Sequence, residues 1–164
     1  MRHSRTNRRT VAVANHMPSL EVPTEEIIAL FHSLDALPEP DIPDGELSVA
    51  FLPASTMAEL HLRFFDDPEP TDVITFVGEL SFAGEICVGV EAAVVFAHKH
   101  GLPFAEELCR YLIHGWLHLA GYRDDSTHAH TEMRQAEDAL LGKITAAGKQ
   151  PRFSISPTQH CMSD

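Results

Sequence analysis

The sequence predicts an α+β fold in which a small mixed β-sheet is flanked by several α-helices. Short runs rich in β-branched and aromatic residues predict the strands, and longer stretches with apolar residues at helical spacing predict the helices. A chain of 164 residues has the usual length of one domain. We therefore expect a flexible basic arm at residues 1–9, a single domain at 10–147 and a loose C-terminal tail at 148–164.

The N-terminal half predicts strands and helices in alternation. Residues 24–34 begin with a threonine and two acids after a proline, as a first helical turn does, and a Pro-rich stretch at 38–45 ends this helix. Ser55 is a candidate N-cap for a second helix. The expected elements are strands at 10–15, 46–52 and 72–77 and helices at 24–34 and 56–64.

The C-terminal half predicts one strand followed by helices. Gly101 and Gly121 each follow a helical apolar pattern and suit the left-handed conformation in which helices often end. Pro103 suits the first turn of the helix between them. The expected elements are a strand at 85–90 and helices at 91–100, 103–120 and 130–141.

The composition argues against a membrane protein and against a disulfide framework. The longest mostly apolar stretch, residues 86–97, is well short of the roughly 20 residues that a membrane-spanning helix needs. The Arg-rich N-terminus lacks the apolar run of a signal peptide, so we expect a cytoplasmic protein. Three cysteines without C-x-x-C spacing predict neither disulfides nor a thiolate zinc site, and Cys87 and Cys109 are expected in the core.

The predicted domain is strongly acidic. The net charge is −12, and the first nine residues carry four arginines and no acid, so the remaining 155 residues carry −16. A protein that follows a phosphate backbone normally presents a basic face. This balance argues against tight, nonspecific binding of nucleic acid.

The segment from His114 to Asp124 carries the metal-ligand pattern H-x-x-x-H-x-x-G-x-x-D. Two histidines four apart on a helix lie about 40° from each other around its axis, so both imidazoles can face one ion. Gly121 allows the chain to leave the helix with a positive φ and to return toward the same face. We therefore predict that His114, His118 and Asp124 bind one metal ion and leave a position for water.

This pattern has the spacing of the metzincin zinc motif, with two differences. Asp124 replaces the third histidine, and aspartate remains an accepted Zn²⁺ ligand. Gly115 stands where zinc proteases have their general base, so peptide hydrolysis by that mechanism is disfavoured and no catalytic residue beyond a metal-bound water is indicated. A glycine inside a helix costs about 1 kcal/mol relative to alanine, which suggests that a substrate or a neighbouring strand approaches Gly115 closely.

Other side chains near the pattern are alternative ligands. His128, His130 or Asp125 replaces Asp124 as the third ligand if the turn runs differently. Two further histidines end the expected helix at 91–100, and because they are two residues apart they face different directions. We expect those two to be solvated.

The metal-ligand segment resembles the bacterial YbeY endoribonucleases, whose signature is H-G-x-L-H-L-x-G-Y-D-H. Residues 114–122 read H-G-W-L-H-L-A-G-Y. Upstream, residues 70–76 read P-T-D-V-I-T-F and resemble the family's P-T-D-V-L-S-F strand, while residues 84–86 read G-E-I where the family has G-D-I. The motifs stand in the family's order, and the resemblance covers about residues 10–145.

The resemblance implies a YbeY-like catalytic domain with one Zn²⁺ ion that cleaves single-stranded RNA as an endoribonuclease. It implies roles in 16S rRNA 3′-end maturation and ribosome quality control, with rRNA and ribosomal particles as partners. Neither a membrane nor a nucleotide cofactor is expected, and no oligomeric state is indicated. The metal would activate a water molecule or assist attack by the RNA 2′-hydroxyl.

Two positions depart from the family pattern. Asp124 stands where the family usually has its third histidine. Phe65 stands where the family's N-x-x-Y-R segment has its arginine, which removes a donor for a phosphate, and Arg63 starts from the opposite helix face. Two alternative hypotheses follow: a non-catalytic ribosome-assembly binding factor with a structural metal, and a metal hydrolase of another substrate.

Overall fold

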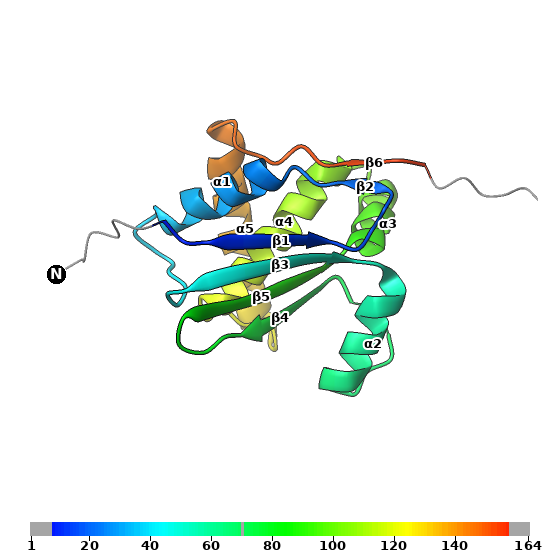
Figure 1. Ribbon diagram of the computed structural model, residues 1–164, viewed down its shortest axis with the longest axis horizontal. Coiled ribbons are helices and arrows are strands. Elements are labelled where there is room, and N and C mark those ends of the chain that lie inside the picture. The colour runs from blue at the N-terminus through cyan, green and yellow to red at the C-terminus, as the bar shows by residue number, and fades with distance from the viewer. Residues whose placement is uncertain (1–7, 70, 158–164) are drawn as a thin grey trace, which may run out of the picture.

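The computed structural model describes residues 8–69 and 71–157 and confirms the α+β fold (Figure 1). A four-stranded sheet is accompanied by helices and by a two-stranded ribbon that pairs a segment near each end of the described chain. The strands are β1 Val11–Asn15, β2 Leu20–Glu21, β3 Glu46–Leu52, β4 Val73–Val77, β5 Phe82–Gly89 and β6 Ser154–Ile155. The helices are α1 Thr24–Asp35, α2 Ala54–Phe65, α3 Val90–His100, α4 Phe104–Leu119 and α5 Thr127–Ala146.

The main sheet is mixed, with the strand order β1-β3-β5-β4. β1, β3 and β5 run parallel, and β4 runs antiparallel to β5 at one edge. The register places Val49 of β3 between Val13 of β1 and Ile86 of β5. The edge strand β4 also contacts α4, so this helix lies against the β4 side of the sheet.

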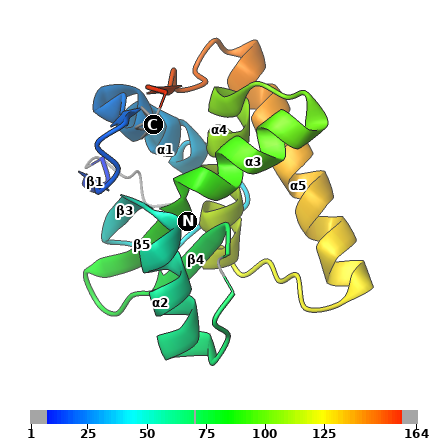
Figure 2. The ribbon, with the colours of Figure 1, turned by 90° about the vertical axis from the view of Figure 1, so that its right-hand side faces the viewer.

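Alternate residues along the strands serve two separate apolar clusters, as the period of two in a strand requires. Val49 and Phe51 of β3 belong to the main core, which α1, α4 and α5 share. Ala50 and Leu52 belong to a second, smaller cluster that includes Met57 of α2. The sheet is therefore covered on both faces, with α2 on the side opposite to α1 and α4 (Figure 2).

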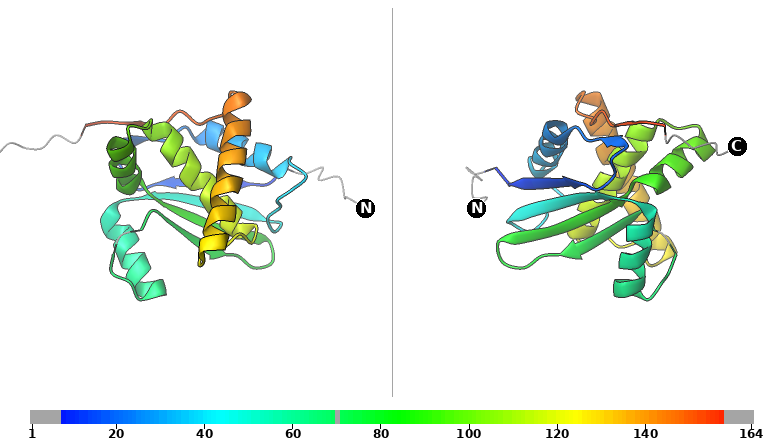
Figure 3. Two further views of the ribbon diagram at one scale, coloured as in Figure 1. Left: turned by 180° about the vertical axis from the view of Figure 1, so that it is seen from behind. Right: turned by 45° about the vertical axis from the view of Figure 1, so that its right-hand side comes forward.

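Helix α4 is the central element of the fold. It contacts β4, β5, α3 and α5, and α5 crosses its outer side (Figure 3). Most of its residues are buried, and Trp116 has no exposed surface. A helix that is buried nearly all round is fixed by its neighbours on every side. The packing therefore fixes the positions of the polar side chains on α4.

Cys87 and Cys109 are buried and free, as predicted. Burial raises the pKa of each thiol to about 12, so neither is a thiolate at neutral pH. Within the described residues, no helix combines the length and the apolar character that crossing a membrane requires.

Two helices begin at least two residues earlier than predicted. α2 starts directly after Pro53, and no side chain caps it, so the expected N-cap Ser55 lies within its first turn. α5 starts at Thr127 instead of residue 130 because the hydroxyl of Ser126 accepts a hydrogen bond from the amide of Ala129 at 3.1 Å. This N-cap was not predicted from the sequence.

The segment after α5 differs from the expected loose tail. β6 pairs with β2, with Ile155 opposite Leu20. The ring of Phe153 is buried against Phe51, with the ring centroids 5.5 Å apart. The side chain of Arg152 donates to Glu26 of α1 at 2.6 Å. The apolar side chain and the short strand thus attach this segment to the core, and residues 158–164 lie outside the described part.

The basic N-terminal arm is described only at its end, because residues 1–7 lie outside the described part. Arg9, which was expected to belong to this flexible arm, is instead bound to the domain. Its guanidinium donates to the carboxylate of Asp35 at 2.7 Å and to the carbonyl of Gly45 at 2.6 Å. Arg9 therefore ties the entry of β1 to the end of α1.

Candidate metal centre

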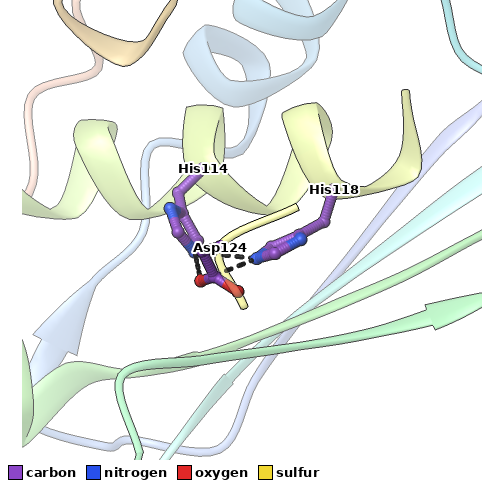
Figure 4. A group of neighbouring side chains, drawn as sticks. All are labelled: His114, His118 and Asp124. Carbon is purple, nitrogen blue, oxygen red and sulfur yellow. Dashed lines mark hydrogen bonds and ion pairs between the residues drawn. The ribbon is translucent and has the colours of Figure 1, made fainter. Parts of the chain in front are cut away.

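His114 and His118 project from the same side of α4 toward the segment that follows the helix (Figure 4). The helix ends at Leu119, just before the predicted stop Gly121, whose φ is 101°, and the amide of Tyr122 donates back to the carbonyl of Leu117 at 3.0 Å. This reversal brings Asp124 beneath the two imidazoles (Figure 4). A local feature of the sequence, one glycine three residues after the second histidine, thus assembles the group.

The three predicted ligand side chains come together in the structure. The Nε2 atoms of His114 and His118 are 3.0 Å apart. An Asp124 carboxylate oxygen lies 3.6 Å from the first and 3.4 Å from the second. One candidate ligand atom from each residue lies within 4.8 Å of the others. The Asp124 side chain is 43% exposed, so the group opens to solvent on that side.

The outer ring nitrogens of both histidines are held by acceptors. His118 Nδ1 lies 3.0 Å from the carbonyl oxygen of Tyr122, and His114 Nδ1 lies 2.9 Å from a carboxylate oxygen of Glu137. A carbonyl and a carboxylate accept hydrogen bonds, so each Nδ1 carries the hydrogen. In the neutral rings, both Nε2 lone pairs then face each other beside a carboxylate. That arrangement suits a cation, and the donor set of two imidazoles and one carboxylate suits Zn²⁺.

The surroundings of His114 favour a positive charge. Burial alone lowers the pKa of His114, but the hydrogen bond to Glu137 and the negative charges of Glu137, Asp72 and Asp124 raise the pKa above its usual range. A second proton on His114 would lie on Nε2, where it can donate to Nε2 of His118.

The alternative third ligands are placed differently. Asp125 accepts hydrogen bonds from the guanidinium of Arg123, and His128 pairs with Glu132 at 3.1 Å in the first turns of α5. His130 borders a small cavity beside His114, about 130 Å³ in volume. Within residues 8–69 and 71–157, the group of candidate ligands contains Asp124 and none of these three.

Gly115 is required by the packing of α4 on β5. A Cβ atom at this position would lie 2.4 Å from Cγ2 of Ile86 and 3.1 Å from its Cγ1. The close neighbour is therefore a strand, one of the two reasons that the sequence suggested for a glycine here. The contact sets the distance between α4, which carries His114, and the sheet.

The end of α2 carries an exposed aromatic side chain where the family pattern has arginine. Phe65 is 55% exposed, and its ring lies 5.6 Å from the ring of His61. Arg63 is also exposed, on the same terminal turn. Asp72, at the start of β4, accepts a hydrogen bond from the amide of Val73 at 2.8 Å. Among the described residues, none of these belongs to the group of candidate ligands.

Glu137 is the residue of this centre that sequence reasoning missed. It lies on α5, 23 residues after His114, and it is 5% exposed. The available signal was an acid on the apolar stripe that Met133, Leu140 and Leu141 form at helical spacing. A buried acid on such a stripe needs a partner, and here the partner is His114.

A family model, related sequences and a solved structure each match this chain, and most of these matches cover the greater part of its length. A family model described as Endoribonuclease YbeY matches residues 12–145. The Endoribonuclease YbeY of Rhodococcus opacus is 33% identical over 80% of this chain and 80% of its own length. The protein of that name from Protochlamydia amoebophila is 37% identical over 56% of this chain, a match that spans 65% of that protein. The solution structure of TM1509 from Thermotoga maritima has the same fold, with a TM-score of 0.56, 22% identity, and coverage of 92% of this chain and 100% of that one.

Proposed function

The chain belongs to the YbeY family, and from this premise we propose that it is a zinc-dependent endoribonuclease with one catalytic domain at residues 10–147. We assign His114, His118 and Asp124 as the metal ligands. The observation that carries the assignment is the pair of Nε2 atoms 3.0 Å apart, with a carboxylate oxygen within 3.6 Å of both. The family name supports RNA as the substrate.

The chain's own residues supply the geometry of the proposed reaction. A bound divalent ion supplies Lewis acidity and lowers the pKa of a coordinated water. His114 and His118 would hold the ion from α4, and Asp124 would complete the ligand set from the loop after this helix. Gly115 brings no side chain into the centre, so no general base follows the first histidine.

The proposed substrate is single-stranded RNA near the 3′ end of 16S rRNA, with a role in rRNA maturation and ribosome quality control in the cytoplasm. The net charge of −12 disfavours tight binding to free RNA through a basic face. A ribosomal particle can supply the affinity, which leaves this chain to contribute contacts near the centre.

Phe65 favours a second candidate function, that of a ribosome-assembly factor in which the metal stabilises the fold and RNA is not cleaved. An exposed phenylalanine cannot donate hydrogen bonds to a scissile phosphate as an arginine does. In that case, loss of a histidine ligand would unfold the chain instead of removing an activity.

The experiment incubates zinc-loaded protein with a precursor of the 16S rRNA 3′ end, both free and within the small ribosomal particle, and maps the new RNA ends. His118→Ala serves as the variant without a complete ligand set, and Asp125→Ala is the matched control. We expect cleavage by the wild type and by Asp125→Ala but not by His118→Ala, which stays folded. Binding of the particle without any cleavage by the wild type would support the assembly factor instead.

A further inference from the structure

We infer that Glu137 is a positioning residue of the metal centre: it holds the imidazole of His114 through Nδ1 and so aims Nε2 at the ion. This inference rests on the proposed metal site and goes beyond its ligands. Its basis is the contact of 2.9 Å between His114 Nδ1 and a carboxylate oxygen of Glu137.

The carboxylate of Glu137 is built into the interior. Among the described residues, Glu107 and Glu137 are the two buried acids. A buried carboxylate destabilises a fold unless it is paired. Glu137 has such partners, because Arg110 lies 3.6 Å and Arg134 lies 3.9 Å from its second oxygen, Oε1. One oxygen therefore faces the two guanidinium groups, and the other faces His114.

The two histidines are held in different ways. His118 depends on the main-chain carbonyl of Tyr122, which comes from the turn that ends its own helix. His114 depends on a side chain from α5, a helix that crosses α4 (Figure 3). The orientation of the His118 ring therefore depends on the local backbone, and that of the His114 ring depends on the packing of α5 against α4. A substitution at position 137 can remove the second kind of support.

The expected effect follows from how outer partners act on metal-ligating histidines. An acceptor at Nδ1 fixes the tautomer and the ring orientation, and a carboxylate also makes the imidazole a stronger ligand. Loss of such a partner typically lowers metal affinity about 10- to 100-fold. An amide in place of the carboxylate still accepts the hydrogen bond through its carbonyl oxygen but lacks the negative charge.

The test measures zinc affinity by competition with a chromophoric chelator for the wild type, Glu137→Ala, Glu137→Gln and the matched control Asp138→Asn. Asp138 is the next residue of α5; it pairs with Arg110 at 2.7 Å, and its side chain is 58% exposed. We expect a loss of about 10- to 100-fold for Glu137→Ala. We expect a smaller loss for Glu137→Gln and no more than about a twofold change for Asp138→Asn.

A second readout separates positioning from general destabilisation. In the zinc-loaded protein, long-range ¹H–¹⁵N spectra should show a hydrogen on His114 Nδ1 that exchanges slowly with water in the wild type and in Glu137→Gln and much faster in Glu137→Ala, where no acceptor holds it. If Glu137→Ala does not fold, the Gln variant, which keeps the shape of the side chain, still gives the comparison.

Two outcomes overturn the inference: a folded Glu137→Ala that binds zinc like the wild type, or an equal loss in Asp138→Asn. Because the measurement is metal binding and not cleavage, a wild type that binds zinc but leaves RNA intact refutes the nuclease and leaves the role of Glu137 testable. A wild type that binds no divalent ion refutes the metal site and the inference together.

Discussion

Replacement of Gly115 by alanine tests whether the packing of α4 on β5 sets the distance between the helix that carries His114 and the sheet. In an open helix position, alanine is about 1 kcal/mol more favourable than glycine. At position 115 the new Cβ would lie 2.4 Å from Cγ2 of Ile86, where ordinary carbon contacts are about 3.5–4.0 Å. The helix or the strand must therefore move by about 1 Å.

Ile86 cannot move alone. It has no exposed surface, and β5 is hydrogen-bonded to β3 on one side and to β4 on the other. Overpacking of this kind costs about 1–3 kcal/mol, and a contact as short as this one belongs in the upper half of that range. After subtraction of the helix gain, we expect Gly115→Ala to lower the free energy of unfolding by about 1–2 kcal/mol.

Gly142 of α5 provides the matched control. It also lies inside a helix, but nothing lies within 4 Å of a Cβ added there. Gly142→Ala should therefore raise the free energy of unfolding by up to about 1 kcal/mol. The two glycine-to-alanine changes thus have opposite expected signs, and their difference is about 2–3 kcal/mol.

The assay is urea unfolding of the zinc-free protein, followed by far-UV circular dichroism, with zinc affinity measured alongside. Gly115→Ala should also weaken zinc binding, because a shift of α4 moves His114 relative to Asp124. An equal gain of stability in both variants would contradict this expectation. In that case Ile86 yields without cost, and packing on β5 does not require a glycine.

Three further predictions concern the pH dependence, the ordered C-terminal segment and the buried thiols. Zinc affinity should fall as the pH drops through the pKa of His114, because the protonated ring cannot bind the ion. Since neighbouring carboxylates raise this pKa, the loss of zinc affinity should begin above the value of about 6.5 for an ordinary histidine when the affinity is measured against pH. A loss that begins only well below this value would contradict the expectation. Phe153→Ala should lower the free energy of unfolding by about 3 kcal/mol because it removes the ring packed on Phe51, and a loss under about 0.5 kcal/mol in urea unfolding would show that the segment adds little. In a Cys161→Ser variant, which removes the third cysteine of the sequence, a thiol reagent at about pH 8 should modify neither Cys87 nor Cys109 until denaturant is added, because burial raises both pKa values to about 12. Rapid reaction of the folded protein would refute this.

The features that were predictable from the sequence are local ones. The spacing of His114 and His118, the glycine at 121 and the aspartate three residues later are read along a short segment, and the structure brings the three side chains together as the pattern indicates. The four strands of the main sheet were predictable because short runs rich in β-branched and aromatic residues mark them, whereas the short strands β2 and β6 were not predicted. The start of α5 was also a local feature, but the capping role of Ser126 was overlooked.

The features that were missed depend on contacts between distant segments. Glu137 becomes part of the centre only because α5 packs on α4. Phe153 is ordered because Phe51, about a hundred residues earlier, provides an apolar surface for its ring. No periodicity or spacing near either residue specifies its partner. The reason for Gly115 is intermediate, since its cost in a helix was visible but the contact with Ile86 was not.

The most direct test of the central claim is a zinc titration of RNA cleavage by initially zinc-free protein, with a labelled single-stranded RNA and with Asp124→Ala beside the wild type. We expect wild-type cleavage to rise with added zinc up to one equivalent and then to stay constant. Asp124→Ala should cleave little RNA at the same zinc concentrations, because the third ligand is missing. Equal cleavage by both proteins, or cleavage that persists in a chelator, would contradict the assignment of His114, His118 and Asp124 as a catalytic metal centre.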